Sequence, residues 1–248
     1  MTVSDEAIEV LYRDDRCAVV SKPSGLMAHA SSLSRGEDDF LLHRLRDQFQ
    51  SKIHLIHRLD RATSGCMLLA FDAEMAALLG KIFMERDVRK DYLAVCRGWP
   101  AERFIVEHDL DGGPGKPEKK PAVTEFIRLA AAEIALPSAA HDSSRYALML
   151  CSPVTGRFRQ IRRHLKHVSH HLIGDTSHGD GRHNRNFRML GVHRMLLHAW
   201  RLQFVHPLSG EPVNCQAPLD GEFRKALQVL GIAESVLEDG NFAKSETG

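Results

Sequence analysis

One carboxylate in the chain stands in a setting that suits nucleophilic chemistry. Asp60 lies between Arg58 and Arg61, and two hydroxyl residues and a glycine follow at Thr63–Gly65. Nearby cations favour the charged form of a carboxylate, and a polar turn of this kind can hold it at a fixed place on a loop. Such a carboxylate is suited to act as a nucleophile. The same residues would also form an ordinary surface turn in which Asp60 pairs with an arginine, so the local chemistry leaves both interpretations open.

The net charge of +1 conceals a strongly basic segment. Residues 156–206 hold 10 of the 33 Lys and Arg residues and 2 of the 32 Asp and Glu residues, a local charge of +8, together with 9 of the 15 histidines. This asymmetry favours a surface that binds a polyanion such as nucleic acid. A solvated charged face is the alternative.

Several classes of protein are excluded or disfavoured. The 5 cysteines stand singly, and without CxxC spacing they favour reduced thiols over a disulfide framework or a zinc ribbon. No run of about 18 apolar residues is present and the N-terminus is polar, so we expect no membrane segment, no signal peptide and a cytoplasmic location. The chain has no GxGxxG and no GxxxxGK[ST] motif for a nucleotide cofactor.

The elements that must position Asp60 can be read from the hydrophobic pattern. Ile53–Leu59 leads into the loop at Asp60–Gly65, and the apolar run Cys66–Phe71 predicts a strand. Asp72 is a suitable N-cap for the clearest helix, whose apolar face comprises Met75, Leu78, Leu79, Ile82 and Phe83. A strand from Tyr92 to Cys96 follows that helix.

The rest of the chain alternates irregularly between strands and helices, which indicates an α+β fold with a mixed sheet rather than a doubly wound one. We expect further strands or apolar segments at Ile8–Tyr12, Cys17–Val20, Ala122–Leu129, Tyr146–Cys151 and Met195–Val205, and further helices at Phe40–Phe49, Arg159–Val168 and Gly221–Ile232. The glycine- and proline-rich segment Asp111–Pro121 predicts a surface loop. Residues 8–232 are expected to form one catalytic domain, and the polar residues 233–248 a frayed tail.

A resemblance to a known family favours the catalytic interpretation of Asp60. The segment His57–Gly65, HRLDRATSG, resembles the HRLD-x-x-TSG signature of the RluA-type pseudouridine synthases. Further segments resemble that family in the same order, from about Ile8 to Leu219: Lys22–Gly25 with His29, Lys90–Gly98, Thr155–Arg162, Ile173–Asp175, Leu197–Ala199, His206–Pro207 and Gly210–Glu211. The resemblance implies a pseudouridine synthase fold, with a mixed, mostly antiparallel central sheet, flanking helices and a central RNA-binding cleft.

The resemblance also implies roles for individual residues in the isomerisation of uridine to pseudouridine within structured RNA. Asp60 would be the nucleophile, and Arg162 would pair with it. Tyr92 would pack against the target base and assist loss of the ring proton. The residues expected to bind RNA are Arg58, Arg61, Arg157, Arg159, Arg163 and His164, with Arg61 entering the RNA stack. Because the isomerisation is redox-neutral and uses no phosphate energy, no cofactor and no metal are expected.

The substrate expected from the resemblance is tRNA. We expect the protein to bind no membrane and to need no obligate protein partner. The catalytic pattern begins near Ile8, which leaves no room for the N-terminal S4 domain of many members. Segments within residues 162–185 resemble members that modify uridine 65 in the T-arm stem of tRNA. The alternative within the family is a short enzyme that acts on a tRNA anticodon stem-loop or on 23S rRNA.

Some positions depart from the family pattern or permit another class. The departures are Ser21, Arg159, His171 and His178, where asparagine, histidine, proline and tyrosine are usual, and they affect substrate contacts rather than the chemistry. The spacing of His164, His167, His170 and His171 would permit a metal-dependent hydrolase, although no HExxH motif is present. Tyr92 could be an ordinary core residue, and a non-catalytic RNA-binding module is the remaining alternative.

Overall fold

The computed structural model describes residues 7–28, 40–137 and 141–238. His29 and residues 239–248 of the expected tail lie outside this part of the chain. The described strands are β1 (Glu9–Arg13), β2 (Cys17–Lys22), β3 (His54–Leu55), β4 (Ser64–Ala70), β5 (Arg89–Arg97), β6 (Arg103–Glu107), β7 (Leu110–Asp111), β8 (Lys119–Lys120), β9 (Val123–Ile134), β10 (Ser144–Pro153), β11 (Leu197–Val205) and β12 (Pro212–Gln216). The described helices are α1 (Leu41–Phe49), α2 (Ala73–Glu85), α3 (Gln160–His167), α4 (Gly181–Met189), α5 (Gly221–Val229) and the 3₁₀ helix η1 (Glu234–Leu237).

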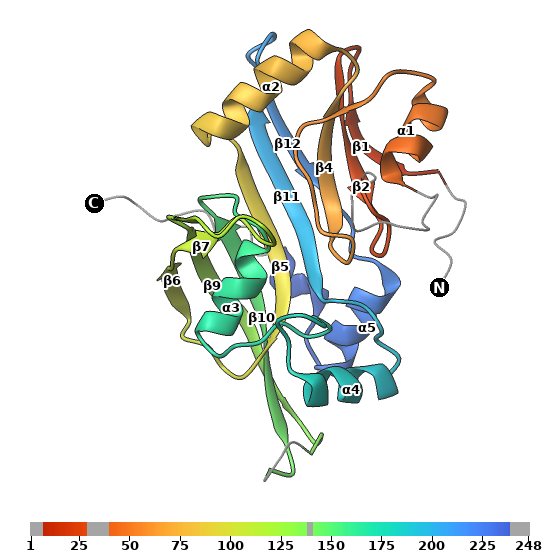
Figure 1. The fold of residues 1–248 in the computed structure, drawn as a ribbon. Coiled ribbons are helices and arrows are strands. Elements are labelled where there is room, and N and C mark those ends of the chain that lie inside the picture. Colours follow the sequence, from red (N-terminus) through yellow and green to blue (C-terminus); the bar gives the residue numbers. More distant parts are fainter. Residues whose placement is uncertain (1–6, 29–39, 138–140, 239–248) are drawn as a thin grey trace.

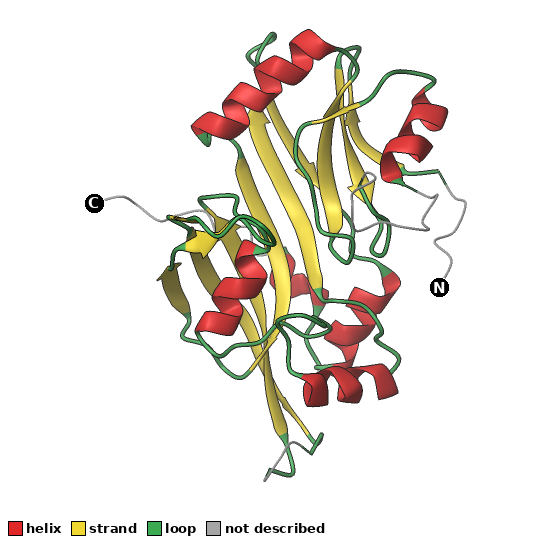
Figure 2. Cartoon of the chain, in the orientation of Figure 1, coloured by secondary structure: helices red, strands yellow, loops and turns green. Residues whose placement is uncertain are grey.

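A single large sheet runs through the described part of the molecule (Figure 2). Its strand order is β1-β2-β4-β11-β5-β10-β9-β6, with β12 paired to β11 and β3 paired to β4. The pairing of β4 with β11 is parallel, and the other pairings in this sheet are antiparallel. The α+β class and the mixed, mostly antiparallel sheet are therefore confirmed.

Helices cover both faces of the sheet because its strands are apolar on both sides (Figure 1). Along β5, Leu93 and Val95 pack in the cluster that contains the buried side chains of α5, whereas Ala94 and Cys96 pack in the cluster that contains those of α3. This alternation follows from the two-residue period of a strand. The β2–β4 half of the sheet is covered in the same way by α1 and α2. None of the helices in the described residues is long and apolar enough to cross a membrane.

Most expected elements are present, and Asp72 caps α2 by accepting a hydrogen bond from the backbone N–H of Met75 at 2.8 Å. Helix α4 was not expected, because its buried face is largely polar. The segment expected to be a surface loop, Asp111–Pro121, includes β8 and the end of β7, which pair with each other. The chain beyond Ile232 continues into η1, where Leu237 is buried.

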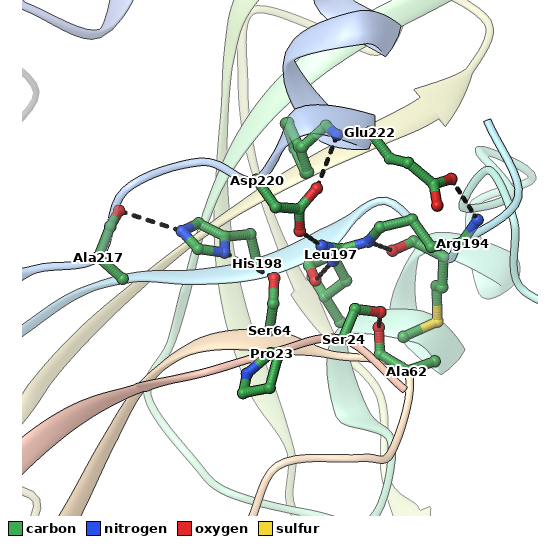
Figure 3. A network of polar contacts seen from close by, with 12 residues as sticks. Pro23, Ser24, Ala62, Ser64, Arg194, Leu197, His198, Ala217, Asp220 and Glu222 are labelled. Carbon is green, nitrogen blue, oxygen red and sulfur yellow. Dashed lines mark hydrogen bonds and ion pairs between the residues drawn. The ribbon is translucent and has the colours of Figure 1, made fainter. Parts of the chain in front are cut away.

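The strand that follows Asp60 is anchored to β11 at its first residues. Gly65 has a φ of +107°, and a Cβ at this position would lie 2.1 Å from the carbonyl oxygen of Ala199, so only glycine permits this close approach. The hydroxyl of Ser64 lies 2.7 Å from Nδ1 of His198, and Nε2 of His198 lies 3.2 Å from the carbonyl oxygen of Ala217 (Figure 3). A carbonyl oxygen only accepts, so His198 donates through Nε2 and accepts from Ser64.

This buried histidine predicts an acid sensitivity of the fold. Burial lowers the pKa of His198 to about 4, although the hydrogen bond to Ala217 opposes the shift. A histidine in the unfolded chain has a pKa of about 6.5. Between these two pKa values the unfolded chain therefore binds a proton at this residue and the folded protein does not. We expect the free energy of unfolding to fall by about 2 kcal/mol through this residue between pH 7 and pH 5.

Urea denaturation of the wild type and of His198→Gln at both pH values measures this effect. The Gln variant should be less stable at neutral pH but should show a pH dependence that is shallower by about 2 kcal/mol. Other titrating groups are common to both proteins and cancel in the difference. Parallel pH dependences would show that His198 is not the sensitive group.

Candidate active site

Asp60, Tyr92 and Arg162 line one cavity of about 660 Å³, as the sequence analysis expected them to lie together. Asp60 comes from the loop between β3 and β4, Tyr92 from β5 and Arg162 from the first turn of α3. The volume lies within the range of small-molecule binding sites, roughly 300–1,000 Å³. The cavity can therefore accommodate a single nucleotide.

The loop that carries Asp60 is held by backbone and side-chain hydrogen bonds. The N–H of Thr63 donates to the carbonyl of Asp60 at 3.0 Å, which closes a turn. The buried ammonium group of Lys22 donates to the carbonyl of Arg61 at 3.1 Å, and the hydroxyl of Ser24 donates to the carbonyl of Ala62 at 2.9 Å (Figure 3). These contacts fix the backbone directly after Asp60.

The guanidinium group of Arg162 lies between two carboxylates. Its Nη1 atom lies 2.5 Å from Oδ2 of Asp60, while Nε and Nη2 lie 2.7 and 2.8 Å from the two oxygens of Asp175. The side chain of Asp175 is fully buried and that of Arg162 is 7% exposed, whereas that of Asp60 is 23% exposed toward the cavity. Arg162 is therefore oriented from behind by one carboxylate and presents its remaining nitrogen to the other.

Electrostatics within this group favour the charged forms of the buried pair. Burial alone would lower the pKa of Arg162, but its hydrogen bonds to Asp175 and Asp60 and their charges outweigh burial and raise it. Burial alone would raise the pKa of Asp175, but Arg162 and the backbone N–H groups of His178 and Ser177 lower it. The two charges stabilise each other, as expected for a buried pair with complete hydrogen bonding.

No role for Asp175 was expected from the sequence, although this residue ends the family-like segment Ile173–Asp175. Its Oδ1 atom accepts from the N–H groups of Ser177 and His178 at 2.8 and 2.9 Å. Asn184 of α4 donates to the carbonyl of Asp175 at 2.9 Å. Its place in that family segment was the available signal, but only the fold brings it to Arg162.

The start of α3 is set by the buried side chain of Gln160. Its Oε1 atom accepts from the hydroxyl of Thr155 at 2.7 Å and from the N–H of Arg157 at 3.0 Å. Its Nε2 atom donates to the carbonyl of Val123 at 2.9 Å on β9. Because Gln160 is tied to β9 and to the loop that follows β10, the helix turn that carries Arg162 has a defined position beside the cavity.

Aromatic groups form the wall of the cavity near Tyr92. The rings of His57 and Phe83 stack at 4.9 Å with an interplanar angle of 16°, and Lys90 lies 5.7 Å from the centroid of Phe83. Burial, with smaller contributions from the charges of Cys66 and Asp60, raises the pKa of Tyr92. The phenol therefore remains protonated at neutral pH.

Cations surround the opening of the cavity. Besides Arg162, the basic residues in its lining are Arg58, Arg86, Lys90, Arg157 and Arg159, and Asp60 is the single carboxylate of that lining. Arg159 adopts a left-handed backbone conformation with φ of 52° before α3 and donates to the hydroxyl of Ser177 at 3.3 Å. The cavity thus presents strongly positive walls to a polyanion.

Three residues expected to bind RNA lie elsewhere. Arg61 donates to the carbonyl of Gly25 at 2.9 Å and lines a neighbouring cavity of about 870 Å³. Arg163 does not line the catalytic cavity, and its guanidinium pairs with Asp111 at 2.7 Å. His164 is completely buried, with Nε2 lying 3.2 Å from the carbonyl oxygen of His108. The guanidinium of Arg163 is thus already paired with a carboxylate, and the side chain of His164 has no access to solvent in this structure.

The histidines that would permit a metal centre do not converge. His167 stacks on His108 at 3.8 Å, and His170 lies 3.0 Å from the carbonyl oxygen of Arg97. The described residues contain one group of possible ligands, Asp14, Cys17 and His206, none of which lines this cavity. There the Nδ1 atom of His206 accepts from the N–H of Ser209 at 3.1 Å, which places the ring proton on Nε2, the atom facing Asp14. A histidine that binds a metal through Nε2 must carry no proton on that nitrogen.

Comparison with known proteins agrees with the fold and the cavity. A family model described as RNA pseudouridylate synthase matches residues 16–167. The tRNA pseudouridine synthase C of Vibrio parahaemolyticus is 38% identical over 88% of this chain and 93% of its own length. The Vibrio cholerae protein of the same name is 36% identical over 93% and 98%, respectively.

Comparison with solved structures also finds a pseudouridylate synthase. The structure of human RNA Pseudouridylate Synthase Domain Containing 1 superposes with a TM-score of 0.70 at 26% identity, covering 88% of this chain and 86% of the human one. Together with the sequence relatives, this likeness shows that the chain belongs to the RNA pseudouridylate synthase family and is an enzyme that isomerises uridine to pseudouridine.

Proposed function

We propose that the substrate is tRNA and that the modified nucleotide is uridine 65 in the T-arm stem. The observation that carries the tRNA assignment is the similarity, over nearly the full length, to relatives named tRNA pseudouridine synthase C. The position rests on the resemblance within residues 162–185. These residues include Arg162, Asp175 and Asn184, which lie in contact beside the cavity.

In the proposed mechanism the target uridine leaves the stem and enters the cavity, where Asp60 acts as the nucleophile. Extruding a base from a stem costs a few kcal/mol. Contacts between phosphates and the cations around the opening offset that cost. The carboxylate is partly exposed toward the cavity and is held in place by Arg162, so it does not need to reorganise before it reacts.

The isomerisation breaks the bond between N1 and C1′ and forms a bond between C5 and C1′. The proton on C5 is lost and N1 gains one, so atoms and electrons balance without an oxidant or a reductant. Negative charge develops on the uracil as the glycosidic bond breaks, and the lining cations stabilise it. Tyr92 and the stacked rings of His57 and Phe83 give the detached base an apolar wall against which to rotate.

In this scheme the effect of Arg162 on Asp60 depends on the direction in which its guanidinium group points. Asp175 occupies two of its nitrogens and leaves Nη1 for Asp60. We therefore assign Asp175 as a positioning residue, since it touches Arg162 and lies outside the lining of the cavity. A displacement of the reacting group by about 1 Å is sufficient to lower a rate by roughly 10²-fold.

Replacing Asp60 with asparagine tests the role of the nucleophile. Asn keeps the size and one oxygen of the side chain but removes the charge, so turnover is expected to fall by roughly 10⁴-fold or more while RNA binding is largely retained. Pseudouridine formation and RNA affinity are measured on the same preparation. Loss of RNA binding would assign Asp60 a structural role instead, and turnover near the wild-type rate would show that Asp60 is not the nucleophile.

Replacing Asp175 with asparagine tests the positioning role. The kcat is expected to fall by roughly 10²-fold with little change in KM, because the substrate contacts remain while Arg162 loses its fixed direction. Asp111→Asn is the matched control, since it removes the carboxylate that pairs with Arg163 outside the cavity lining. An effect on KM alone, or equal losses in both variants, would contradict the assignment.

The proposed substrate is tested by mapping pseudouridine in total RNA from cells with and without this gene. Deletion should remove pseudouridine at tRNA position 65 and leave other sites unchanged. The wild-type gene should restore the modification, and the Asp60→Asn gene should not. Loss at an anticodon stem-loop or in 23S rRNA would replace the proposed target by the alternative within the family.

A further inference from the structure

Helix α4 presents a row of arginines to solvent. Arg182, Arg185 and Arg188 are exposed and spaced by three residues, so they follow one another along one side of the helix. The opposite side is buried and comprises His183, Asn184, Asn186 and Phe187. The helix therefore has a fixed orientation and a face that is basic throughout.

No carboxylate neutralises these three arginines in the described part of the chain. Within the described residues, none of their side chains forms a hydrogen bond or an ion pair. Other arginines of the described chain do form ion pairs with carboxylates: Arg16, Arg89, Arg97, Arg145, Arg162, Arg163, Arg194 and Arg224. The charge on α4 is thus available to a ligand.

The row lowers the stability of the free protein. Like charges three residues apart on a helix repel each other, and α4 contains no acidic residue to compensate. A bound polyanion would remove this repulsion. An unpaired row of one sign is therefore better suited to a phosphate backbone than to solvent alone.

The buried side of α4 is connected directly to the catalytic group. Asn184 accepts from the N–H of Gly174 at 2.7 Å and donates to the carbonyl of Asp175 at 2.9 Å. Asp175 in turn holds Arg162. The position of the arginine row relative to the reacting carboxylate is consequently fixed by hydrogen bonds between backbone and side chains.

The distance from the cavity to this row is short enough for one RNA stem to reach both. Arg159 lines the cavity and donates to Ser177, and Ser177 precedes Arg182 by five residues. A chain of that length spans at most about 18 Å. The first arginine of the row therefore lies within about 18 Å of Ser177, which contacts a residue of the cavity lining.

We propose that Arg182, Arg185 and Arg188 form an RNA-docking face that binds phosphate groups of the substrate outside the catalytic cavity. The proposal rests on the RNA substrate and deepens the proposed function, but it does not depend on which uridine is modified. Each arginine that neutralises a phosphate releases a counterion, so the face contributes affinity that weakens as salt rises. It contributes no base specificity, because phosphate contacts carry no sequence information.

The test measures the affinity of the Arg182→Gln/Arg185→Gln/Arg188→Gln variant for an unmodified tRNA transcript over a range of salt concentrations. Three lost contacts should weaken binding roughly 10- to 100-fold near physiological salt and reduce the slope of log K against log salt by about 2–3. The variant should also be at least as thermally stable as the wild type, because the repulsion along α4 is removed.

Two further variants control for total charge and for the shape of the side chain. Arg46→Gln/Lys52→Gln/Arg103→Gln removes three exposed cations of other elements and should leave the salt slope unchanged. The triple Arg→Lys variant of α4 keeps the charge and should retain most of the slope. If the Gln variant of α4 does not fold, Arg185→Gln alone should lower the slope by about 0.7–0.9.

The proposal is overturned if the α4 variant binds tRNA with the affinity and salt slope of the wild type, or if the control variant loses as much. This outcome can be distinguished from failure of the proposed tRNA target. If mapping places the modification in 23S rRNA, the same titration is carried out with that rRNA stem, and the α4 variant should again show the reduced slope.

Discussion

A guanidinium held between two carboxylates is the interaction on which the site depends. Arg162 contacts Asp60 in front and Asp175 behind, and the three residues come from the β3–β4 loop, α3 and the segment before α4. Breaking a buried charge pair by removing one partner typically costs about 3–5 kcal/mol. Forming the pair also requires both charges to be removed from water, and this desolvation cost offsets much of their attraction. The pair is therefore not primarily a source of folding stability. Its consequence is a carboxylate with one fixed direction at the floor of the cavity.

The rest of the fold supports that arrangement through hydrogen bonds to the backbone of the segments that carry or adjoin these three residues. Lys22 and Ser24 bind carbonyls after Asp60, Gln160 binds β9 before Arg162, and Asn184 binds the backbone around Asp175. Each segment is therefore fixed independently of its partner across the ion pair. A site on loops gains the precision of the sheet when the loops are tied to strands and helices in this way.

The arginines of the basic segment divide into two groups with different physical roles. Arg163 and Arg194 are paired with carboxylates and join elements of the fold. Those that line the cavity and those on α4 include side chains that no carboxylate neutralises, and these produce a positive field at the surface. Composition alone treats both groups as one local charge of +8, because it contains no information on pairing. The part of that charge that we propose to bind RNA is smaller and lies at two places joined by the segment from Arg159 to Asp180.

The sequence by itself predicted the residues that we propose to react and most of the regular elements that carry them. The HRLDRATSG segment identified Asp60, and hydrophobic periodicity predicted α2, α3 and most strands, because these elements bury apolar faces. The tertiary structure alone decided that Asp175 orients Arg162, that Arg163 is paired, that His164 is buried and that α4 exists. These features depend on contacts between residues far apart in the chain. The buried side of α4 is largely polar and is satisfied by such distant hydrogen bonds, so it leaves no periodic signal in the sequence.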